Sequence, residues 1–540
     1  MTETKPKRSL AGIAGIVAIA TLISKVVGLV RQLAIAFAFG VGTAKAAYDI
    51  SAIIPSFFLI LLGGINGPFH SAMVSALAKR RKEESAPLVE AVSTLIGCFF
   101  LVVSLIVFAF APFFIDLLAS GLQQTAQGLE TRAIAIQQLR IMAPIAWFAG
   151  MIGIGFGTLN AADQYWLPSI SPLLSSLTLI IGIGIFLVSS GTQATDPNYA
   201  MVGGMVLAIG TLAGTVLQWL AQFWVVQRQS GLGRFRVRFV WNDPGVKEVF
   251  NVMGPALFSS GMLQINVITN LTFAAYLPNA VAAISSLDYA NLLVQTPLGL
   301  LSNMILVPFL PIFSRLTDPS QVDQLKARIR QGLLITAISM LPLSALIISL
   351  ATPIVRLVYE RGAFKPEATQ LVASVLMAYA VGMFVYLSRD VLVRVFYALG
   401  DGNTPFKISI VNIFLNAFFD FLLYKPFGIV GIVLATVSVN ILSVLALLYF
   451  LDRRLNGLPL LEWSYPIFGL LSSSILAGTA SWFISNTIAN LPGLNGFFLA
   501  LMQVAIAGSI GLGIFALLAS QLRLPEVDLF TDRIRQRFRR

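Results

Sequence analysis

The sequence predicts an all-α polytopic membrane protein with about fourteen transmembrane helices, arranged as two six-helix lobes and a C-terminal helix pair. Three observations support this class. Of the 540 residues, 57% are apolar and 11% are charged, whereas roughly a quarter of an ordinary globular chain is charged. The mean hydropathy is +0.84, and apolar residues gather in runs long enough to cross a bilayer. Basic residues concentrate in alternate loops, as the positive-inside rule requires.

The apolar runs define the helices in order. The first covers residues 10–39 and is too long for a signal-peptide core, so we expect it to remain as helix 1. The others cover 46–78, 88–115, 132–160, 165–189, 199–227, 247–277, 281–314, 332–359, 367–399, 405–424, 428–451, 464–487 and 494–520. Several exceed the ~20 residues of a straight crossing. We therefore expect tilts and kinks, above all where glycines and Pro68 interrupt the second run.

The basic residues test this count. With fourteen crossings, 25 of the 36 Lys and Arg residues fall on the side that holds both termini. Six fall on the opposite side, and they are Lys45, Arg132, Arg356, Arg361, Lys365 and Lys425. We therefore expect both termini to be cytoplasmic. The net charge of +12 then marks topology, and we expect no nucleic-acid partner.

Two sequence echoes, six helices apart, predict the lobes. Tyr48 and Asp49 precede a proline in helix 2 as Asp288 and Tyr289 do in helix 8, and a short polar break near Pro168 is repeated near Pro405. The predicted divisions are a cytoplasmic N-terminus (1–8), a first lobe (9–230), a basic cytoplasmic linker (231–246), a second lobe (247–455), helices 13 and 14 (456–520) and a basic cytoplasmic tail (521–540).

Rare residue types exclude several chemistries. One cysteine, Cys98, and one histidine, His70, cannot build a disulfide framework or a Cys/His metal cluster. We interpret His70 as a packing residue, and the alternative is a protonation switch at the cavity. The glycine-rich stretch 150–157 lacks the Lys-Ser/Thr of a P-loop, and the sequence shows no acidic cluster of the kind that a polyprenyl-processing enzyme needs. We expect a transporter without a cofactor, driven by a coupling cation, the membrane potential or substrate consumption.

Ionisable residues inside the apolar runs are candidate functional residues, because charge at bilayer depth is costly. Lys25 and Arg31 flank Gly28 on helix 1. A spacing of six places them about 120° apart, so both face one cavity only if Gly28 bends the helix. Such a cation pair suits a phosphate or pyrophosphate. The alternative is that both side chains snorkel toward the membrane surfaces.

Two further cationic positions remain open. Arg140 on helix 4 is a candidate substrate contact, or else the partner of an acidic group such as Asp116 or Asp49. On helix 10, Asp390 and Arg394 have the i,i+4 spacing of an ion pair and lie next to Arg389, which favours a structural role.

Helix 11 carries a polar stripe. Asn412, Asn416 and Asp420 recur every four residues and therefore share one helix face. With Thr436 on helix 12, and amides such as Asn266 and Asn270 on helix 7, they form a candidate site for a hard cation. The alternative is that these amides only join neighbouring helices.

A set of local motifs occurs in a fixed order along most of the chain. The motifs are SKVVGLVR at 24–31, FG at 39–40, MGPA at 253–256, YERGAF at 359–364, FYALGD at 396–401 and TPFK at 404–407. Together they resemble the MurJ (MviN) family. The resemblance implies the MOP exporter fold and the flipping of lipid II, an undecaprenyl-pyrophosphate-linked peptidoglycan precursor, across a bacterial cytoplasmic membrane. We also expect membrane lipids as partners and a monomer.

Carried over by position, Arg31 matches a cavity arginine of the family, and Lys25 stands where another arginine is usual. Three family arginines are absent, since Leu59 and Ile60 replace two and Leu292 replaces the third. The usual acidic residue of helix 2 aligns with Ala46, one turn before Asp49. The resemblance thus implies a less basic cavity here than the family pattern has.

The predicted mechanism is alternating access of the two lobes. The headgroup enters an inward-open cavity lined by Lys25, Arg31, Asp49 and Arg140, while the lipid tail trails in a groove formed by helices 13 and 14. The alternative is a polysaccharide-lipid flippase or another MOP-type exporter, and rivals from other classes are a membrane enzyme and a scaffold without transport.

Overall fold

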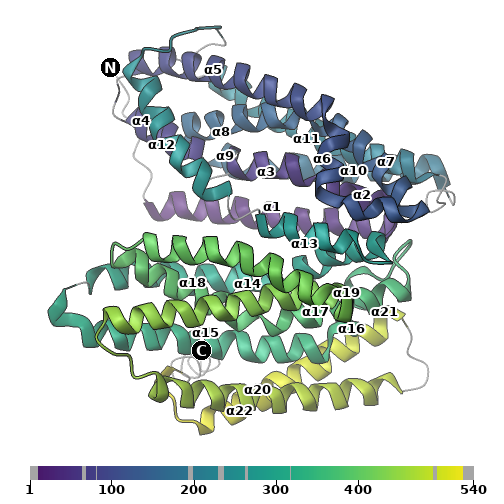
Figure 1. The fold of residues 1–540 in the computed structure, drawn as a ribbon, viewed down its shortest axis with the longest axis vertical. Coiled ribbons are helices and arrows are strands. Elements are labelled where there is room, and N and C mark those ends of the chain that lie inside the picture. The colour runs from purple at the N-terminus through teal and green to yellow at the C-terminus, as the bar shows by residue number, and fades with distance from the viewer. Residues whose placement is uncertain are drawn as a thin grey trace. The chain divides into compact units, whose positions relative to one another are not determined.

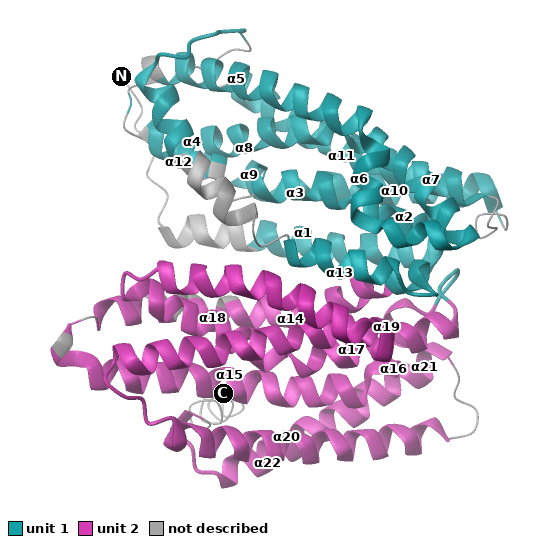
Figure 2. Cartoon of the chain, viewed as in Figure 1, with its two compact units in different colours: residues 1–285, 361–364 teal, residues 286–360, 365–540 magenta. Residues whose placement is uncertain are grey.

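The computed structural model describes residues 10–63, 68–78, 80, 82–191, 199–228, 236–261, 265–316, 318–490 and 496–526. Within these ranges the regular structure is helical and includes no strand, which confirms the predicted all-α class. The predicted N-terminal segment 1–8, and parts of the linker and of the basic tail, lie outside the described residues. Two compact units divide the chain, one of residues 1–285 with 361–364 and one of 286–360 with 365–540 (Figure 2).

Unit 1 contains the elements up to the start of α14, as labelled in Figure 1. They are α1 (Leu10–Phe39), α2 (Thr43–Ser51), α3 (Ile53–Leu61), α4 (Pro68–Ala78), α5 (Lys82–Ala109), α6 (Ala111–Ala119), the 3-10 turn η1 (Ser120–Gln124), α7 (Ala126–Met142), α8 (Ile145–Ala161), α9 (Trp166–Ile170), α10 (Pro172–Ser190), α11 (Ala200–Arg228), α12 (Pro244–Gly261) and α13 (Ile265–Ala275).

Unit 2 contains the remaining elements. They are α14 (Ala280–Arg315), the 3-10 turn η5 (Pro319–Gln321), α15 (Val322–Ser349), α16 (Ala351–Tyr359), α17 (Pro366–Val381), α18 (Met383–Ala398), α19 (Asn403–Arg454), α20 (Leu460–Ala489), α21 (Gly496–Met502), the π-helical turn η6 (Gln503–Ala507) and α22 (Gly508–Gln521).

The predicted spans match these helices closely. Among the described residues, ten helices are long and apolar enough to cross a membrane, and two bent pairs, α2 with α3 and α7 with α8, raise the number to twelve. The fifty-two residues of α19 cover two predicted spans, 405–424 and 428–451. The predicted seventh span, 247–277, is shared between α12 and α13. The expectation of about fourteen crossings is therefore roughly consistent with the structure.

The two halves of α19 form a helical hairpin. Gly428 has φ 60° and ψ −138°, a conformation open only to glycine, and it follows Pro426. Thr436 and Asn416 are hydrogen-bonded across the bend at 3.4 Å, whereas twenty residues of straight helix would separate them by about 30 Å. The chain therefore folds back at Gly428 and brings predicted helices 11 and 12 together.

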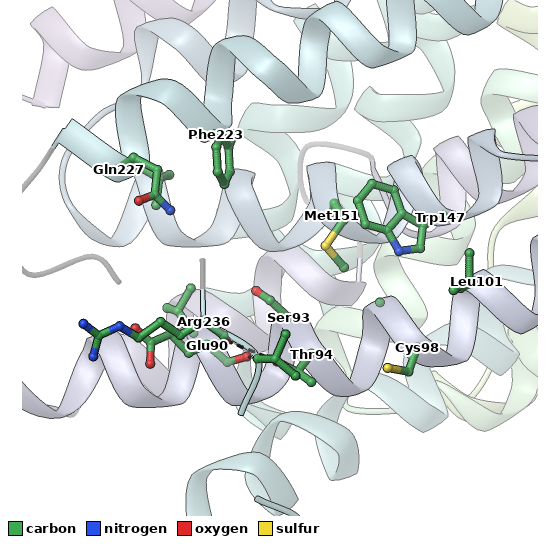
Figure 3. A pocket seen from close by; sticks show the side chains of 14 residues that line it. Glu90, Ser93, Thr94, Cys98, Leu101, Trp147, Met151, Phe223, Gln227 and Arg236 are labelled. Atoms are coloured by element: carbon green, nitrogen blue, oxygen red, sulfur yellow. Dashed lines mark hydrogen bonds between the residues drawn. The ribbon is translucent and has the colours of Figure 1, made fainter. Parts of the chain in front are cut away.

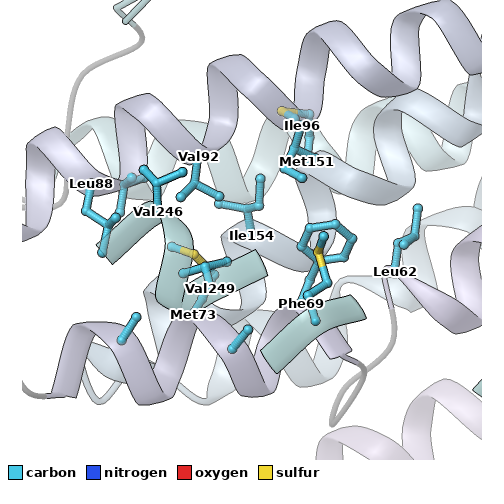
Figure 4. Packing of buried hydrophobic residues seen from close by; sticks show 14 of the residues in the cluster. Leu62, Phe69, Met73, Leu88, Val92, Ile96, Met151, Ile154, Val246 and Val249 are labelled. Atoms are coloured by element: carbon cyan, nitrogen blue, oxygen red, sulfur yellow. The ribbon is translucent and has the colours of Figure 1, made fainter. Parts of the chain in front are cut away.

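The core of unit 1 is built from apolar side chains of α4, α5, α8 and α12 (Figure 4). Phe69 and Met73 on α4 and Val92 on α5 are fully buried there. Val246 and Val249 bring α12 into the same cluster, so the residues after the basic linker pack on unit 1.

Because of this packing, the observed boundary between the compact units differs from the predicted boundary between the lobes. The sequence predicts that the second lobe begins at residue 247, but the second unit begins at Ser286. Besides the apolar contacts of α12, Thr272 on α13 donates a hydrogen bond to the Leu118 carbonyl oxygen at 3.1 Å. Tyr276 and Ser120 are joined at 2.9 Å. Helices α12 and α13 thus belong to the first compact unit.

In unit 2, the C-terminal helices α20 and α22 pack on α15 through a cluster that includes Leu341, Leu470 and Phe515 (Figure 1). Gly478 allows the close approach, because a Cβ there would lie 3.0 Å from the Ala345 carbonyl oxygen. Many large apolar side chains on both units are exposed, for example Val188 at 87% and Phe414 at 71%. Exposed apolar surface of this extent is typical of lipid-facing helices.

Candidate functional site

Arg31 lies on α1 in unit 1 and is half-buried. Its Nε atom is buried and has no hydrogen-bond partner among the described residues. An arginine whose Nε donor is unused retains a donor for binding an oxyanion. Arg31 is therefore the candidate substrate contact whose geometry best fits that role.

Lys25 is exposed on the same helix. The helix runs unbroken from Leu10 to Phe39, and a Cβ on Gly28 would meet nothing within 4 Å. The helix is therefore not broken at Gly28 in this conformation, and a break there is what would bring Lys25 and Arg31 to one face. The two cations lie on different sides of a continuous helix, about 120° apart.

Asp49 on α2 is paired with Lys45, a residue that the charge pattern assigns to an external loop. Lys45 forms an ion pair with Asp49 one turn away, and only 1% of the Lys45 side chain is exposed. The structure thus corrects the assignment of Lys45 to an external loop, because α2 already begins at Thr43. The spacing of four next to an apolar run was a signal that could have identified this pair.

Polar side chains of α7 join α2 and α11. Gln138 is fully buried, accepts a hydrogen bond from Ser51 at 3.1 Å and donates one to the Gly204 carbonyl oxygen at 2.9 Å. Tyr48 and Thr211 are hydrogen-bonded at 2.8 Å. These contacts were not predicted, since single polar residues on apolar helices carry no periodic signal. They hold the segment that carries Asp49 against the rest of unit 1.

Arg140 lies in the last turn of α7, where the helix dipole favours a cation. Its Nε atom is buried without a hydrogen-bond partner among the described residues. One predicted partner, Asp116, is instead held by Arg132 through two contacts of 2.5 and 2.8 Å. Hydrogen bonding from Arg132 lowers the pKa of Asp116. This leaves the candidate substrate role of Arg140 open.

In unit 2, the predicted polar stripe forms a connected group. Asn412, Asn416 and Asp420 are buried on one face of α19. Asn416 donates to Asp420 at 2.8 Å and accepts from Thr436 at 3.4 Å. The structure brings these oxygen-bearing side chains together, which a hard cation requires. Asn266 and Asn270 lie on α13 in unit 1.

The cluster on α18 has a different pairing from the predicted one. Arg389 lies 4.0 Å from Asp390 and donates to Ser443 at 3.1 Å and to Ser409 at 3.3 Å. Arg394 donates to the Leu306 carbonyl oxygen at 3.0 Å. Both arginines thus tie α18 to neighbouring helices, as a structural role predicts.

Other predicted positions are apolar or structural. Leu59 is half-buried on α3, Ile60 is exposed beside it, and Leu292 is half-buried on α14. His70 on α4 is hydrogen-bonded to Asn160 on α8 at 2.6 Å, in keeping with a packing role. Among the described residues, no group of three His, Cys, Asp or Glu side chains could hold a metal ion.

Comparison with known proteins covers nearly the whole chain. Residues 35–503 match the family model described as "Lipid II flippase MurJ". The chain is 55% identical over 536 residues to a "Probable lipid II flippase MurJ" of Synechocystis sp., covering 99% of both chains. It is 28% identical to a "Lipid II flippase MurJ" of Burkholderia cenocepacia, covering 86% of this chain and 88% of the relative.

Two solved structures share the fold. A structure described as "Lipid II flippase MurJ, inward closed conformation" superposes with a TM-score of 0.72 at 23% identity, covering 94% of this chain and 99% of the other. An inward-facing MATE transporter of the MOP superfamily gives a TM-score of 0.65 at 17% identity, covering 82% and 98%. The extent of the family match and the full-length identity decide the assignment: the chain belongs to the lipid II flippase MurJ family.

Proposed function

We propose that this chain is a lipid II flippase, which moves the undecaprenyl-pyrophosphate-linked headgroup from the inner to the outer leaflet during peptidoglycan biosynthesis. The observation that carries the proposal is the 55% identity over 99% of both chains with a relative named as a probable lipid II flippase. Membership in this family places the chain among transporters and not among enzymes.

The membrane setting follows from the same proposal. The chain is a multi-pass membrane protein, and we place it in the bacterial cytoplasmic membrane as a monomer in contact with membrane lipids. Both termini are cytoplasmic in this proposal. Its support is the charge pattern, since 25 of 36 basic residues lie on the side assigned to the termini.

The proposed substrate contact is charge recognition in an apolar setting. Arg31 binds the pyrophosphate through its guanidinium, because its half-buried position and partnerless Nε leave that group available. Arg140 is a second candidate for the same reason. Lys25, exposed on another side of α1, contacts the substrate only in a state where α1 bends. Asp49 acts indirectly, by holding Lys45.

Alternating access is the proposed transport cycle, with a cation or the membrane potential as its energy source. The support for a cation is the buried group of Asn412, Asn416, Asp420 and Thr436, whose carboxylate, amide and hydroxyl oxygens suit a hard cation. The lipid tail follows the surface of the C-terminal helices, where large apolar side chains such as Phe483 and Leu517 are more than half exposed.

The test is complementation of cells depleted of their own lipid II flippase. Arg31→Ala is expected to fail to restore growth while reaching wild-type levels in the membrane, and Arg31→Lys is expected to restore it in part, because lysine keeps the charge but loses two-point binding. Normal growth of the Arg31→Ala strain with normal precursor levels would contradict the role of Arg31.

The identity of the accumulating lipid tests the substrate. Depletion of this protein is expected to leave lipid II in the cytoplasmic leaflet. Accumulation of an intermediate of another polysaccharide pathway would instead assign the chain to the polysaccharide-lipid flippases, whatever the outcome at Arg31.

A further inference from the structure

A cavity of about 210 Å³ lies within unit 1, away from the cations of α1. Its walls are α5, α8, the end of α11 and the extended segment that begins at Arg236. Figure 3 shows Phe223 and Gln227 of α11 facing Ser93 and Thr94 of α5 across this space, with Trp147 and Met151 of α8 farther along. The volume exceeds that of an engineered 150 Å³ protein cavity able to hold a benzene ring.

The lining changes from polar to apolar along α5. Glu90 and Arg236 line one end, and Cys98, Leu101 and Met151 line the other. From Glu90 to Leu101 the helix rises about 16 Å, which is about half of the ~30 Å hydrocarbon core. The cavity therefore has the length and the polarity gradient of one lipid acyl chain in one leaflet.

The cavity is built into the fold and opens to the lipid side. Gly97 lies on the lining, where a Cβ would be in van der Waals contact with Met151 and Trp147 at 3.5 Å, so a larger side chain there would extend into the cavity. Thr94 fixes the outer wall, since its hydroxyl accepts a hydrogen bond from the Arg238 backbone N–H at 2.9 Å. Leu101, on the apolar part of the lining and within the predicted span 88–115, is 52% exposed, which indicates access from the membrane.

The polar end of the cavity has side chains typical of a membrane–water interface. Arg228 lies 3.7 Å from the centre of the Trp224 ring, and Trp224 itself is 55% exposed, as in an interfacial aromatic belt. Arg236 and Arg238 are exposed at the same end of unit 1. The charge pattern assigns all three arginines to the cytoplasmic side. Arg236 lines the cavity beside one carboxylate, Glu90, and Arg228 and Arg238 directly follow the lining residues Gln227 and Val237 in the chain. This excess of basic residues favours an anionic headgroup over a zwitterionic one.

We propose that this cavity binds one acyl chain of an anionic phospholipid of the cytoplasmic leaflet, with its phosphate at Arg236. The basic C-terminal tail of the chain is a poor occupant, because its arginines would meet Arg236 and Arg238. A helix from a second copy is too wide, since a helix with side chains is about 10 Å across and the cavity holds only about 210 Å³. The site is separate from the proposed lipid II contact at Arg31.

Cys98 provides the measurement, because it is the single cysteine of the chain, is exposed and lines the cavity. The full-length protein in neutral detergent is alkylated with N-ethylmaleimide while phosphatidylglycerol or phosphatidylcholine is added, and native mass spectrometry counts the phospholipids bound. Phosphatidylglycerol is expected to slow alkylation in a saturable way and at a concentration about fivefold lower than phosphatidylcholine, the factor for one basic residue at an anionic surface.

Matched variants locate the site. Gly97→Leu fills the cavity and is expected to abolish saturable protection and the bound phospholipid, whereas Gly184→Leu, at an exposed glycine with nothing within 4 Å of its Cβ, keeps both. Arg236→Gln is expected to raise the half-protecting phosphatidylglycerol concentration about fivefold, and Arg238→Gln by less than twofold, because only Arg236 lines the cavity.

Three results would overturn the proposal. The first is wild-type protection in Gly97→Leu. The second is protection by undecaprenyl phosphate but not by phosphatidylglycerol, which would make the cavity part of the substrate path. The third is protection without added lipid that increases with protein concentration, which would indicate a second copy of the chain. None of these readouts depends on flipping, so the lipid II proposal stands or fails separately.

Discussion

Gly153 on α8 is a position where one methyl group should disturb the packing of unit 1. A Cβ at this glycine would fall on the carbonyl oxygen of Leu62, at the end of α3, and would lie 3.0 Å from the Cβ of fully buried Phe69 on α4. The obstacle is backbone, which cannot rotate away as a side chain can. Gly153→Ala must therefore push α8 away from the junction of α3 and α4.

The magnitude follows from a comparison with Gly184. Overpacking in a close-packed core costs about 1–3 kcal/mol, while alanine in place of glycine inside a helix gains about 1 kcal/mol. Gly184 on α10 is exposed, and its Cβ would meet nothing within 4 Å. Gly184→Ala therefore carries the propensity gain without the clash. The difference between the two variants isolates the clash and is expected to be about 1–3 kcal/mol.

Thermal unfolding followed by tryptophan fluorescence is a suitable assay, because the chain has seven tryptophans, whereas thiol-reactive dyes would label exposed Cys98 before unfolding. One kcal/mol corresponds to about 2–4 °C in a domain of 150–250 residues and to less in a longer one such as unit 1. We expect Gly153→Ala to unfold at a lower temperature than Gly184→Ala in the same detergent. A midpoint for Gly153→Ala equal to or above that of Gly184→Ala would refute the packing described for α8.

Two further predictions concern charged groups. The pKa of Asp116 is lowered in the folded state by Arg132, so the pair stabilises the fold above the unfolded-state pKa of about 3.9 and loses this effect as the pH falls through the lower, folded value. Because both side chains are about a third exposed, Arg132→Gln is expected to lower stability by at most about 1 kcal/mol at pH 7. The gap to wild type should narrow steadily as the pH is lowered below about 3.9. A gap that does not change with pH over this range would assign the effect to packing. The second prediction concerns the group around Asp420. At constant ionic strength, a cation that binds there is expected to raise the unfolding temperature of the wild type but not that of Asp420→Asn. Equal responses of the two proteins to every salt would contradict the cation proposal.

The helices were predictable because a membrane span needs a run of apolar residues, and that run is visible in the sequence. The break in helix 2 was also predictable, since glycines and Pro68 lie where α3 ends and α4 begins. The boundary between the compact units was not predictable in this way. It depends on side-chain contacts of α12 and α13 with α4, α6 and η1, such as Val249 in the core of unit 1 and Thr272 on the Leu118 carbonyl oxygen, and such contacts leave no periodic pattern.

The candidate sites also include contacts that could be predicted from the sequence and contacts that could not. The contact of Asn416 with Asp420 was predictable from helical spacing alone, because i and i+4 share a face. The contact of Thr436 with Asn416 follows once the chain reverses at Gly428. Lys45 was assigned wrongly because the glycines at 40 and 42 suggest a loop, whereas α2 begins immediately after them. A shared face for Lys25 and Arg31 depended on a break at Gly28, which the sequence permits and the continuous helix of this conformation does not have.

The pairing of charges inside unit 1 and unit 2 separates structural from functional cations. Lys45 is neutralised by Asp49, Arg389 is bonded by two serines, and Arg394 is bonded to a backbone carbonyl. Each of these would have to break a partly buried interaction, at a cost of about 1–3 kcal/mol, before it could bind an anion. Arg31 and Arg140 have buried Nε atoms without hydrogen-bond partners among the described residues. An incoming pyrophosphate would therefore gain a charge-assisted contact from these two without such a loss, which makes them the cations to test first.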